Sequence, residues 1–354
     1  MTGPTITTDL QKLRHNAETL TSLCHRHGVS LAAVTKCVCA DEQIAGVLLE
    51  SADMLADSRT QNLLKLPADK PRLLLRVPMP SEAAAAVRTA DISLQSEIDT
   101  IRRFGEETAR QGKKHRVILM IDLGDLREGI LYSDERGIER AARAVLAQPA
   151  LELWGIGTNL TCFGGILADE ENLGCLTDIA AALRRSLDTP LPIVSGGNSS
   201  SIGLLLDGRM PKGVNHLRLG EAVLLGNDTA KCAPLPGLYT DVFCLSAELV
   251  EVKTKPSRPI GTAGANAFGE PVHFEDEGEQ LRGILAIGRQ DTNAEGLKPL
   301  DAGVRILGAS SDHLIVDLTQ AKTEYRVGDI LSFLPDYGAL LKAYTSAYVI
   351  KAYQ

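Results

Sequence analysis

The stretch Leu31-Ala-Ala-Val-Thr-Lys36 decides the fold, because it opens a long alternation of apolar runs and helical segments. A short apolar run of this kind is typical of a buried parallel strand. A lysine that ends such a strand is often only a solvated terminus. In a barrel of strand–helix units, however, the carboxyl ends of all strands meet at one face, where the chemistry sits. We therefore treat Lys36 as a candidate amine that forms Schiff bases with carbonyl compounds.

Seven more strand-like runs follow, and segments with helical periodicity separate them. The eight runs are 31–35, 53–56, 72–77, 92–95, 116–122, 151–158, 192–195 and 216–219, with an extension of the last to Leu225 left open. A first helix is expected over Thr8–Arg26. Such alternation implies parallel strands joined by right-handed crossovers. Eight units favour a TIM (β/α)8 barrel, and an open doubly wound sheet is the alternative.

From Cys232 the pattern changes to apolar or period-two runs with glycine and proline between them. These runs are 242–252, 283–287, 304–307, 313–318 and 329–333. The sequence therefore predicts two domains, a barrel over residues 1–231 and a mostly β, largely antiparallel domain over residues 232–354.

Composition narrows the functional classes. The 354 residues carry a net charge of -8 with 4% aromatics, so neither a basic stripe nor stacking surfaces indicate a nucleic-acid partner. No apolar run is long enough for a membrane span or a signal core, so we expect no membrane partner. Seven cysteines, an odd number, favour a reducing cytoplasm, and the C-x-C pair Cys37 and Cys39 does not complete a metal site.

The segment after the seventh strand is the most specific signal for a ligand. Ser195-Gly-Gly-Asn-Ser-Ser-Ser201 leads directly into a helix. Glycines let the backbone come close to an anion, and a helix N-terminus offers free N–H groups. We therefore expect a phosphate to bind here. The alternative is a serine-rich turn and helix cap. Arg218, inside the eighth strand, needs a buried partner, and Gly220-Glu221 after it offers a second backbone approach.

Weaker candidates follow the fifth and sixth strands. Arg127 lies in a loop between Gly124 and Gly129, where a guanidinium suits a carboxylate or phenolate oxygen, although a single arginine in a loop is more often only a surface residue. Asn159 ends the sixth strand and Cys162 follows it. Asparagine often only terminates a strand.

Together these residues resemble the fold-type III pyridoxal-phosphate enzymes, the alanine racemase group. The resemblance implies that Lys36 carries the cofactor and that Arg218 faces its pyridine nitrogen. It also implies that Arg127 contacts the phenolic oxygen and the substrate carboxylate, and that Asn159 replaces a histidine under the ring. The implied phosphate and strand-eight residues are Asn198, Ser199, Ser200, Gly220 and Glu221, with Tyr344 as a candidate tyrosine on the phosphate.

Longer strings resemble the ornithine racemase-like branch of that group. They are Val34-Thr-Lys36, Ala56-Asp-Ser-Arg59, Asp122-Leu-Gly-Asp-Leu-Arg-Glu-Gly129, Gly157-Thr-Asn-Leu-Thr-Cys162, Ser195-Gly-Gly-Asn-Ser-Ser-Ser201, Leu285-Ala-Ile-Gly-Arg-Gln-Asp291 and Gly308-Ala-Ser-Ser-Asp-His313. The resemblance spans nearly the whole chain. It implies a racemase of ornithine or another basic amino acid, working as a homodimer in which the partner's β domain completes the site.

Two departures from alanine racemase leave residues open. Ala40 stands where a phosphate-binding tyrosine is expected, and Ile260-Gly261 stands where the second catalytic base, a tyrosine, is expected. The remaining candidates for that base are Ser311, Asp312, His313 and Cys162, and those for a cationic substrate side chain are Asp291 and Asp312. The alternatives for function are an alanine or broad-specificity racemase, a fold-type III decarboxylase, a non-catalytic cofactor-binding protein and a cofactor-free aldolase.

Overall fold

The computed structural model describes residues 3–262, 264–265, 268–269, 271 and 273–354, and it divides into two compact units. One unit is Leu10–Thr240, and the other combines the segment up to Asp9 with Asp241–Gln354. The sequence places the division at residues 231 and 232. In the structure, strand β1 (Thr5–Thr8) joins the second unit because it pairs antiparallel with β13 and parallel with β19.

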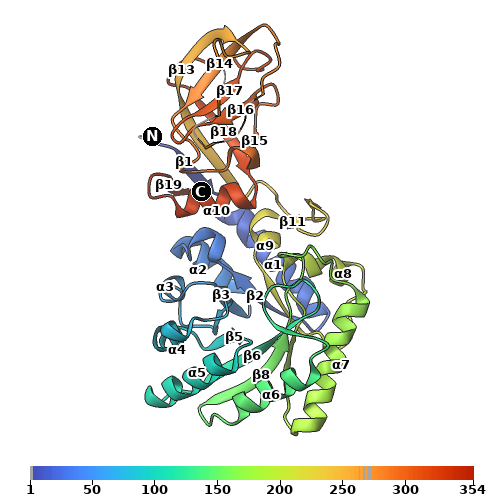
Figure 1. The fold of residues 1–354 in the computed structure, drawn as a ribbon. Helices are drawn as coiled ribbons and strands as arrows, with labels where there is room; N and C mark the ends of the chain where they lie inside the picture. Colours follow the sequence, from blue (N-terminus) through green and yellow to red (C-terminus); the bar gives the residue numbers. More distant parts are fainter. Residues whose placement is uncertain (1–2, 263, 266–267, 270, 272) are drawn as a thin grey trace. The chain divides into compact units, whose positions relative to one another are not determined.

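The first unit is a closed barrel of eight parallel strands (Figure 1). Its strands follow the order β5, β4, β3, β2, β10, β9, β8, β6, and pairing between β5 and β6 closes the ring. Their bounds are β2 (Ser30–Val34), β3 (Met54–Asp57), β4 (Arg72–Leu74), β5 (Ile92–Gln95), β6 (His115–Asp122), β8 (Leu151–Gly157), β9 (Ile193–Ser195) and β10 (His216–Leu219). The predicted TIM barrel is confirmed, and the open sheet is excluded by the closure.

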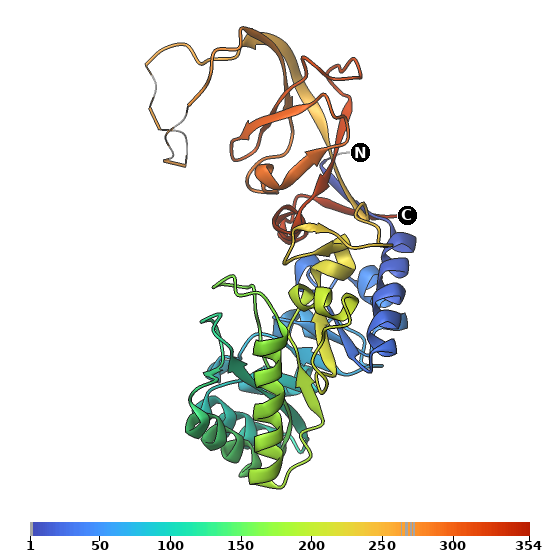
Figure 2. The same cartoon turned by 90° about the vertical axis from the view of Figure 1, so that its right-hand side faces the viewer.

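Helices cover the outside of the barrel, and Figure 2 shows α1 in blue and α7 in light green running along it. The helices are α1 (Leu10–Arg26), α2 (Glu42–Ser51), α3 (Thr60–Leu63), α4 (Ala83–Thr89), α5 (Ile98–Arg110), α6 (Glu135–Leu146), α7 (Glu170–Leu187), α8 (Ile202–Leu206) and α9 (Glu221–Leu225). Short 3-10 turns are η1 (Lys36–Val38), η2 (Pro80–Glu82) and η3 (Ser199–Ser201), and short strands are β7 (Ile130–Leu131), β11 (Asn227–Asp228) and β12 (Ala233–Pro234).

Two sequence expectations need correction at helix ends. The helix expected from Thr8 begins at Leu10, because Thr5–Thr8 forms strand β1 of the β unit, between β13 and β19. The extension of the eighth strand to Leu225 is wrong, because Gly220 turns the chain into α9. The Ser199 hydroxyl oxygen accepts the N–H groups of Gly220 and Ala222, which stabilises that helix start.

Small and medium apolar side chains fill the barrel. One buried cluster joins Ala32, Val34, Met54, Ala56, Leu73, Ile92, Leu94, Ile118 and Met120. A packed interior of this kind leaves no pore, so ligands must bind at a rim.

The second unit is a β domain built on β13 (Phe243–Pro256), which confirms the predicted mostly β second domain. The first half of β13 pairs with β1 and β18, and the second half pairs with β14. Within the described residues of this unit, every strand pairing is antiparallel except that of β1 with β19. The other elements are β14 (Glu279–Leu285), β15 (Leu297–Pro299), β16 (Arg305–Ala309), β17 (Leu314–Asp317), β18 (Ile330–Pro335), β19 (Ile350–Tyr353), α10 (Tyr337–Thr345) and η4 (Ala294–Gly296). Within the described ranges, no helix of either unit has the length and apolar character that crossing a bilayer requires.

Candidate active site

The barrel register gathers the polar candidates of the first unit at one rim. Strand β10 lies between β2 and β9, with Ala32 opposite Arg218 and Ser195 opposite His216. Strands β8 and β6 continue the same row. Because parallel strands end on the same side, the rim brings together residues that close five neighbouring strands: Lys36, Arg218, Asn198, Asn159 and Arg127.

Lys36 opens η1 directly after β2, and its side chain is exposed. Its ammonium group forms no hydrogen bond or ion pair with any residue that the structure describes. The preceding Thr35 donates its hydroxyl to Asp57 Oδ2 at 2.8 Å, which ties the ends of β2 and β3 together. Burial raises the pKa of Asp57, while hydrogen bonds from Thr35 and Asn62 oppose the rise. Lys36 is therefore an available amine on a fixed backbone.

Arg218 is 2% exposed and has three hydrogen-bond partners. Its Nη2 donates to the carbonyl of Thr158 and to Asn159 Oδ1, both at 2.6 Å, and its Nη1 donates to Ser195 Oγ. Burial lowers the pKa of Arg218 to about 10, with the negative charge of Glu128 acting against the fall. The guanidinium therefore stays charged at neutral pH and offers only donors.

Arg218 sets the direction of the hydrogen bonds that join Ser195 and His216. The imidazole is fully buried, burial lowers its pKa to about 3, and its Nδ1 lies 2.7 Å from Ser195 Oγ. Because Arg218 can only donate, Ser195 Oγ accepts a hydrogen bond from it and donates one through its own hydroxyl to His216 Nδ1. The neutral ring then carries its hydrogen on Nε2. His216 thus holds Ser195, which in turn holds Arg218.

Arg127 and Asn159 meet on one carboxylate, that of Glu128. Arg127 donates from Nε and Nη2 to the two oxygens of Glu128, and Asn159 donates from Nδ2 to Glu128 Oε1. Partial burial lowers the pKa of Arg127. The hydrogen bond to Glu128 and the negative charge of Glu128 raise it by more, so the net shift is upward. Asn159 also accepts from Arg218, so one chain of contacts joins the two arginines.

Asp125 fastens the loop after β8 to the loop after β6. Its buried carboxylate accepts the backbone N–H groups of Cys162, Phe163 and Ile166 at 3.1, 2.9 and 3.2 Å. Burial raises the pKa of Asp125, but these hydrogen bonds more than offset it, so the net shift is downward. Exposed Cys162 accepts a contact from Asn198 Nδ2 at 3.2 Å.

Ser199 links the segment after β9 to the start of α9. Asn198 caps η3 by accepting from the N–H of Ser200 at 2.8 Å. Ser199 Oγ accepts from Gly220 and Ala222. Ser199 therefore ties the start of η3 to the start of α9, whose first residue is Glu221. Helix starts suit a phosphate, which here would replace Ser199 Oγ and Asn198 Oδ1 as the acceptor of these N–H groups.

The remaining candidates belong to the β unit. Asp291 is buried and accepts from the Ser346 hydroxyl at 2.6 Å, whereas exposed Asp312 accepts from Gln290 at 2.6 Å. His313 lies exposed in the same turn between β16 and β17. Tyr344 is buried in α10, with its hydroxyl 2.7 Å from Thr8 Oγ1.

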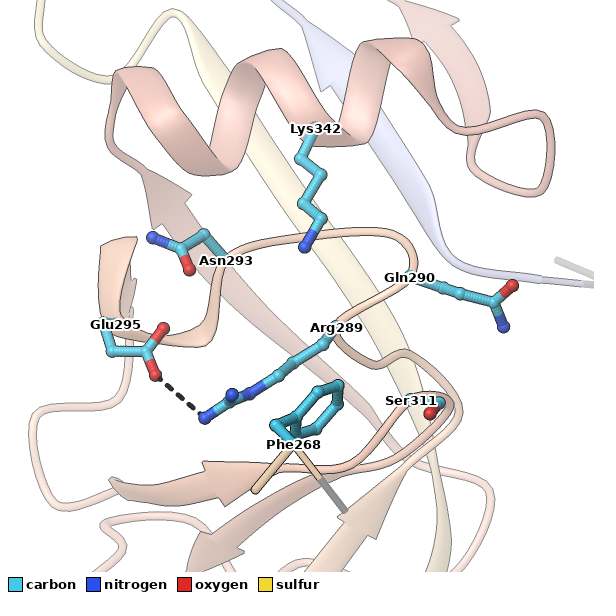
Figure 3. Close-up of a pocket in the computed structure, with 7 residues that line it drawn as sticks. All are labelled: Phe268, Arg289, Gln290, Asn293, Glu295, Ser311 and Lys342. Carbon is cyan, nitrogen blue, oxygen red and sulfur yellow. Dashed lines mark hydrogen bonds and ion pairs between the residues drawn. The ribbon is translucent and has the colours of Figure 1, made fainter. Parts of the chain in front are cut away.

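Ser311 lines a pocket of about 460 Å³ within this unit, together with Phe268, Arg289, Gln290, Asn293, Glu295 and Lys342. Figure 3 shows the Arg289 side chain stacked over Phe268 and ion-paired to Glu295. Among the residues described, no group of three or more histidine, cysteine or acidic side chains is arranged to hold a metal ion.

Three residues of the rim were not assigned from the sequence: Glu128, Ser195 and His216. His216 and Arg218 are two residues apart on one strand, so a period-two reading already places them on the same face. Glu128 gives no comparable signal, because its partner Asn159 belongs to another strand and becomes a neighbour only when the barrel closes.

The chain combines a closed barrel with a lysine after its first strand, a buried arginine on the neighbouring strand, and a second, mostly β domain. This combination defines the alanine racemase class of folds. The family model described as alanine racemase, N-terminal domain, matches residues 8–228. The chain therefore belongs to the alanine racemase N-terminal domain family.

Curated relatives match over nearly the full length. Ornithine racemase from Acetoanaerobium sticklandii is 47% identical over 350 residues, covering 98% of this chain and 99% of the relative. Lysine racemase from Thermotoga maritima is 37% identical over 358 residues, covering 100% and 99%.

Solved structures share the fold at lower identity. Alanine racemase from Bartonella henselae with covalently bound pyridoxal phosphate has a TM-score of 0.74 at 17% identity and covers 100% of both chains. Alanine racemase from Streptomyces lavendulae has a TM-score of 0.74 at 20% identity, covering 100% of this chain and 97% of that one. D-threonine aldolase from Filomicrobium marinum has a TM-score of 0.73 at 16% identity, covering 96% and 88%.

Proposed function

We propose that this chain is a pyridoxal-phosphate-dependent racemase of basic amino acids, with ornithine as the first substrate and lysine as the second. The observation that carries the proposal is that exposed Lys36 follows β2 directly, and that β2 pairs with the strand that carries buried Arg218. Similarity to an ornithine racemase and a lysine racemase over the whole chain supports the choice of substrate.

The donors at the rim fit this cofactor. Lys36 supplies the amine for its aldehyde, and Arg218 offers a donor to an unprotonated ring nitrogen. The starts of η3 and α9 suit its phosphate, which would take over N–H groups that Asn198 and Ser199 engage in this structure. The proposed holding residues also include Asn198, Ser199, Ser200, Gly220, Glu221, Arg127, Asn159 and Tyr344. When bound, the cofactor withdraws electrons from the α-carbon of the attached amino acid, so that its proton is released.

Lys36 has the role of accepting or returning the α-proton on one face. Arg127 binds the substrate carboxylate, which a guanidinium recognises through two parallel N–H groups. Arg218 argues against the decarboxylase alternative, because the resemblance associates an acidic residue with that position in the decarboxylases. For the second face we retain Ser311, Asp312, His313 and Cys162 as candidates, and for a cationic side chain Asp291 and Asp312.

We further propose a homodimer in which the β unit of the partner completes each site, as the resemblance implies. Cytoplasmic location is part of the same proposal, since all seven cysteines are free thiols. Gel filtration with light scattering tests the assembly state.

The experiment that tests the function is incubation of the purified holoenzyme with single L-amino acids in D₂O. We expect deuterium at the α-carbon and the D-enantiomer to appear together for ornithine or lysine. Release of carbon dioxide instead would support a decarboxylase. No exchange with ornithine, lysine, arginine, alanine or serine would support a binding protein.

Lys36→Ala is the matched variant for the cofactor. We expect it to lose the visible absorbance of the bound cofactor and at least a thousandfold in racemisation, since a covalent attachment point and a base disappear together. Borohydride reduction followed by peptide mapping should label Lys36 in the wild type. Lys212→Ala, which removes an exposed lysine from the same unit, serves as the control.

A further inference from the structure

Glu128 is the residue at which the two arginines of the rim are joined. Its carboxylate accepts from Arg127 and from Asn159, and Asn159 accepts from Arg218. The Glu128 side chain is 20% exposed and that of Arg127 is 39% exposed, so the contact lies at the surface of the rim. The positive charge of Arg127 disfavours the charge on Arg218, and the negative charge of Glu128 acts against that effect.

The way in which Glu128 holds Arg127 leaves one edge of the guanidinium available. A guanidinium has a side edge, made of Nε and Nη2, and an end edge, made of Nη1 and Nη2. Glu128 takes the side edge. Within the part of the chain that the structure describes, no residue accepts from Nη1 of Arg127. The end edge is therefore presented to a ligand in a fixed orientation.

We propose that Glu128 is a positioning residue for substrate recognition: it fixes the side edge of Arg127 and, through Asn159, its spacing from Arg218, so that the end edge of Arg127 receives the substrate carboxylate. This inference rests on the proposed function, because it assumes an amino acid substrate. Because Glu128 already holds the Arg127 guanidinium in place, less conformational entropy is lost when the substrate carboxylate binds. Loss of Glu128 should therefore weaken binding of the carboxylate more than it slows the chemistry.

The test compares Glu128→Gln, Glu128→Asp and the wild type, with Glu139→Gln as control. Glu139 pairs with Arg143 on the exposed face of α6, so its replacement also removes one arginine–carboxylate pair. For each holoenzyme, KM and kcat for L-ornithine are measured. The dissociation constant of butyrate, a carboxylate without an amine, is measured by calorimetry.

We expect Glu128→Gln to raise KM and the butyrate dissociation constant together, by about tenfold, with kcat within about twofold of the wild type. Glu128→Asp keeps the charge and should show a smaller rise in both. Glu139→Gln should match the wild type. Unchanged butyrate binding in Glu128→Gln, or a fall in kcat alone, would overturn the inference.

Glu128→Asp keeps the proposal testable if Glu128→Gln does not fold. In that case an aspartate variant that binds butyrate like the wild type contradicts the proposal. Where both variants fold, weaker butyrate binding by Glu128→Asp than by Glu128→Gln contradicts it as well. A wild-type enzyme that racemises no basic amino acid overturns the proposed function. In that case butyrate calorimetry still decides the role of Glu128.

Discussion

At the scale of single residues, the direction of each hydrogen bond follows from which groups can only donate. Arg218 has no acceptor, so it orders Ser195, and Ser195 orders His216. The sequence predicted Lys36 and Arg218 as rim residues because they close strands of the barrel. It could not predict the Ser195 contact, since that depends on the in-register pairing of β9 with β10.

Ser195→Ala tests this arrangement. The change leaves a buried guanidinium N–H and the His216 Nδ1 atom without Ser195 Oγ, so we expect the free energy of unfolding to fall by about 1–3 kcal/mol. Urea unfolding followed by circular dichroism measures the loss. Ser22→Ala, on the exposed face of α1, should stay within about 0.5 kcal/mol. Equal stability of the two variants would contradict the account.

At the scale of elements, the sequence predicts the eight strands of the barrel because each is a short apolar run followed by a segment with helical periodicity. The errors in the prediction concern the residues at which strands and helices begin and end. The α9 start depends on a hydroxyl from another loop, Ser199, which no local pattern reveals. The strand Thr5–Thr8 is not predicted, and its last residue is assigned to the first helix, because its partners β13 and β19 lie more than 200 residues away.

Asp125→Asn tests the fastening of the loop after β8. An amide accepts fewer hydrogen bonds than a carboxylate, so the N–H groups of Cys162, Phe163 and Ile166 lose part of their support. We expect about 2 kcal/mol of destabilisation and faster amide exchange over residues 161–167, measured by mass spectrometry. Asp99→Asn, on the exposed surface of α5, is the control. Unaltered exchange in the Asp125 variant would exclude the fastening role.

At the scale of the whole molecule, two buried histidines make the barrel sensitive to acid. Burial lowers the pKa of His216 to about 3 and that of His115 to about 4, from an ordinary value of 6.5. Between those values the unfolded chain binds protons that the folded chain does not, so stability is full above pH 6.5 and falls as the pH drops towards 4. Each histidine contributes about 1 kcal/mol per pH unit in that window.

Thermal unfolding between pH 4.5 and 7.5 measures the effect. The midpoint should fall on acidification in the wild type and fall less steeply in His115→Gln, which no longer titrates there. His27→Gln replaces an exposed histidine and should keep the wild-type slope. Parallel curves for all three proteins would contradict the prediction.

The pairing of β1 with β13 and β19 also sets an order of events during synthesis. The ribosome makes Thr5–Thr8 before any barrel strand, yet its partners emerge only with residues 243–246 and 350–353. The nascent barrel meanwhile has all of its own strands and can close. Thr5–Thr8 therefore cannot make its first pairing until residues 243–246 have been synthesised, nor its second until residues 350–353 have been, whereas the last barrel strand is complete at Leu219.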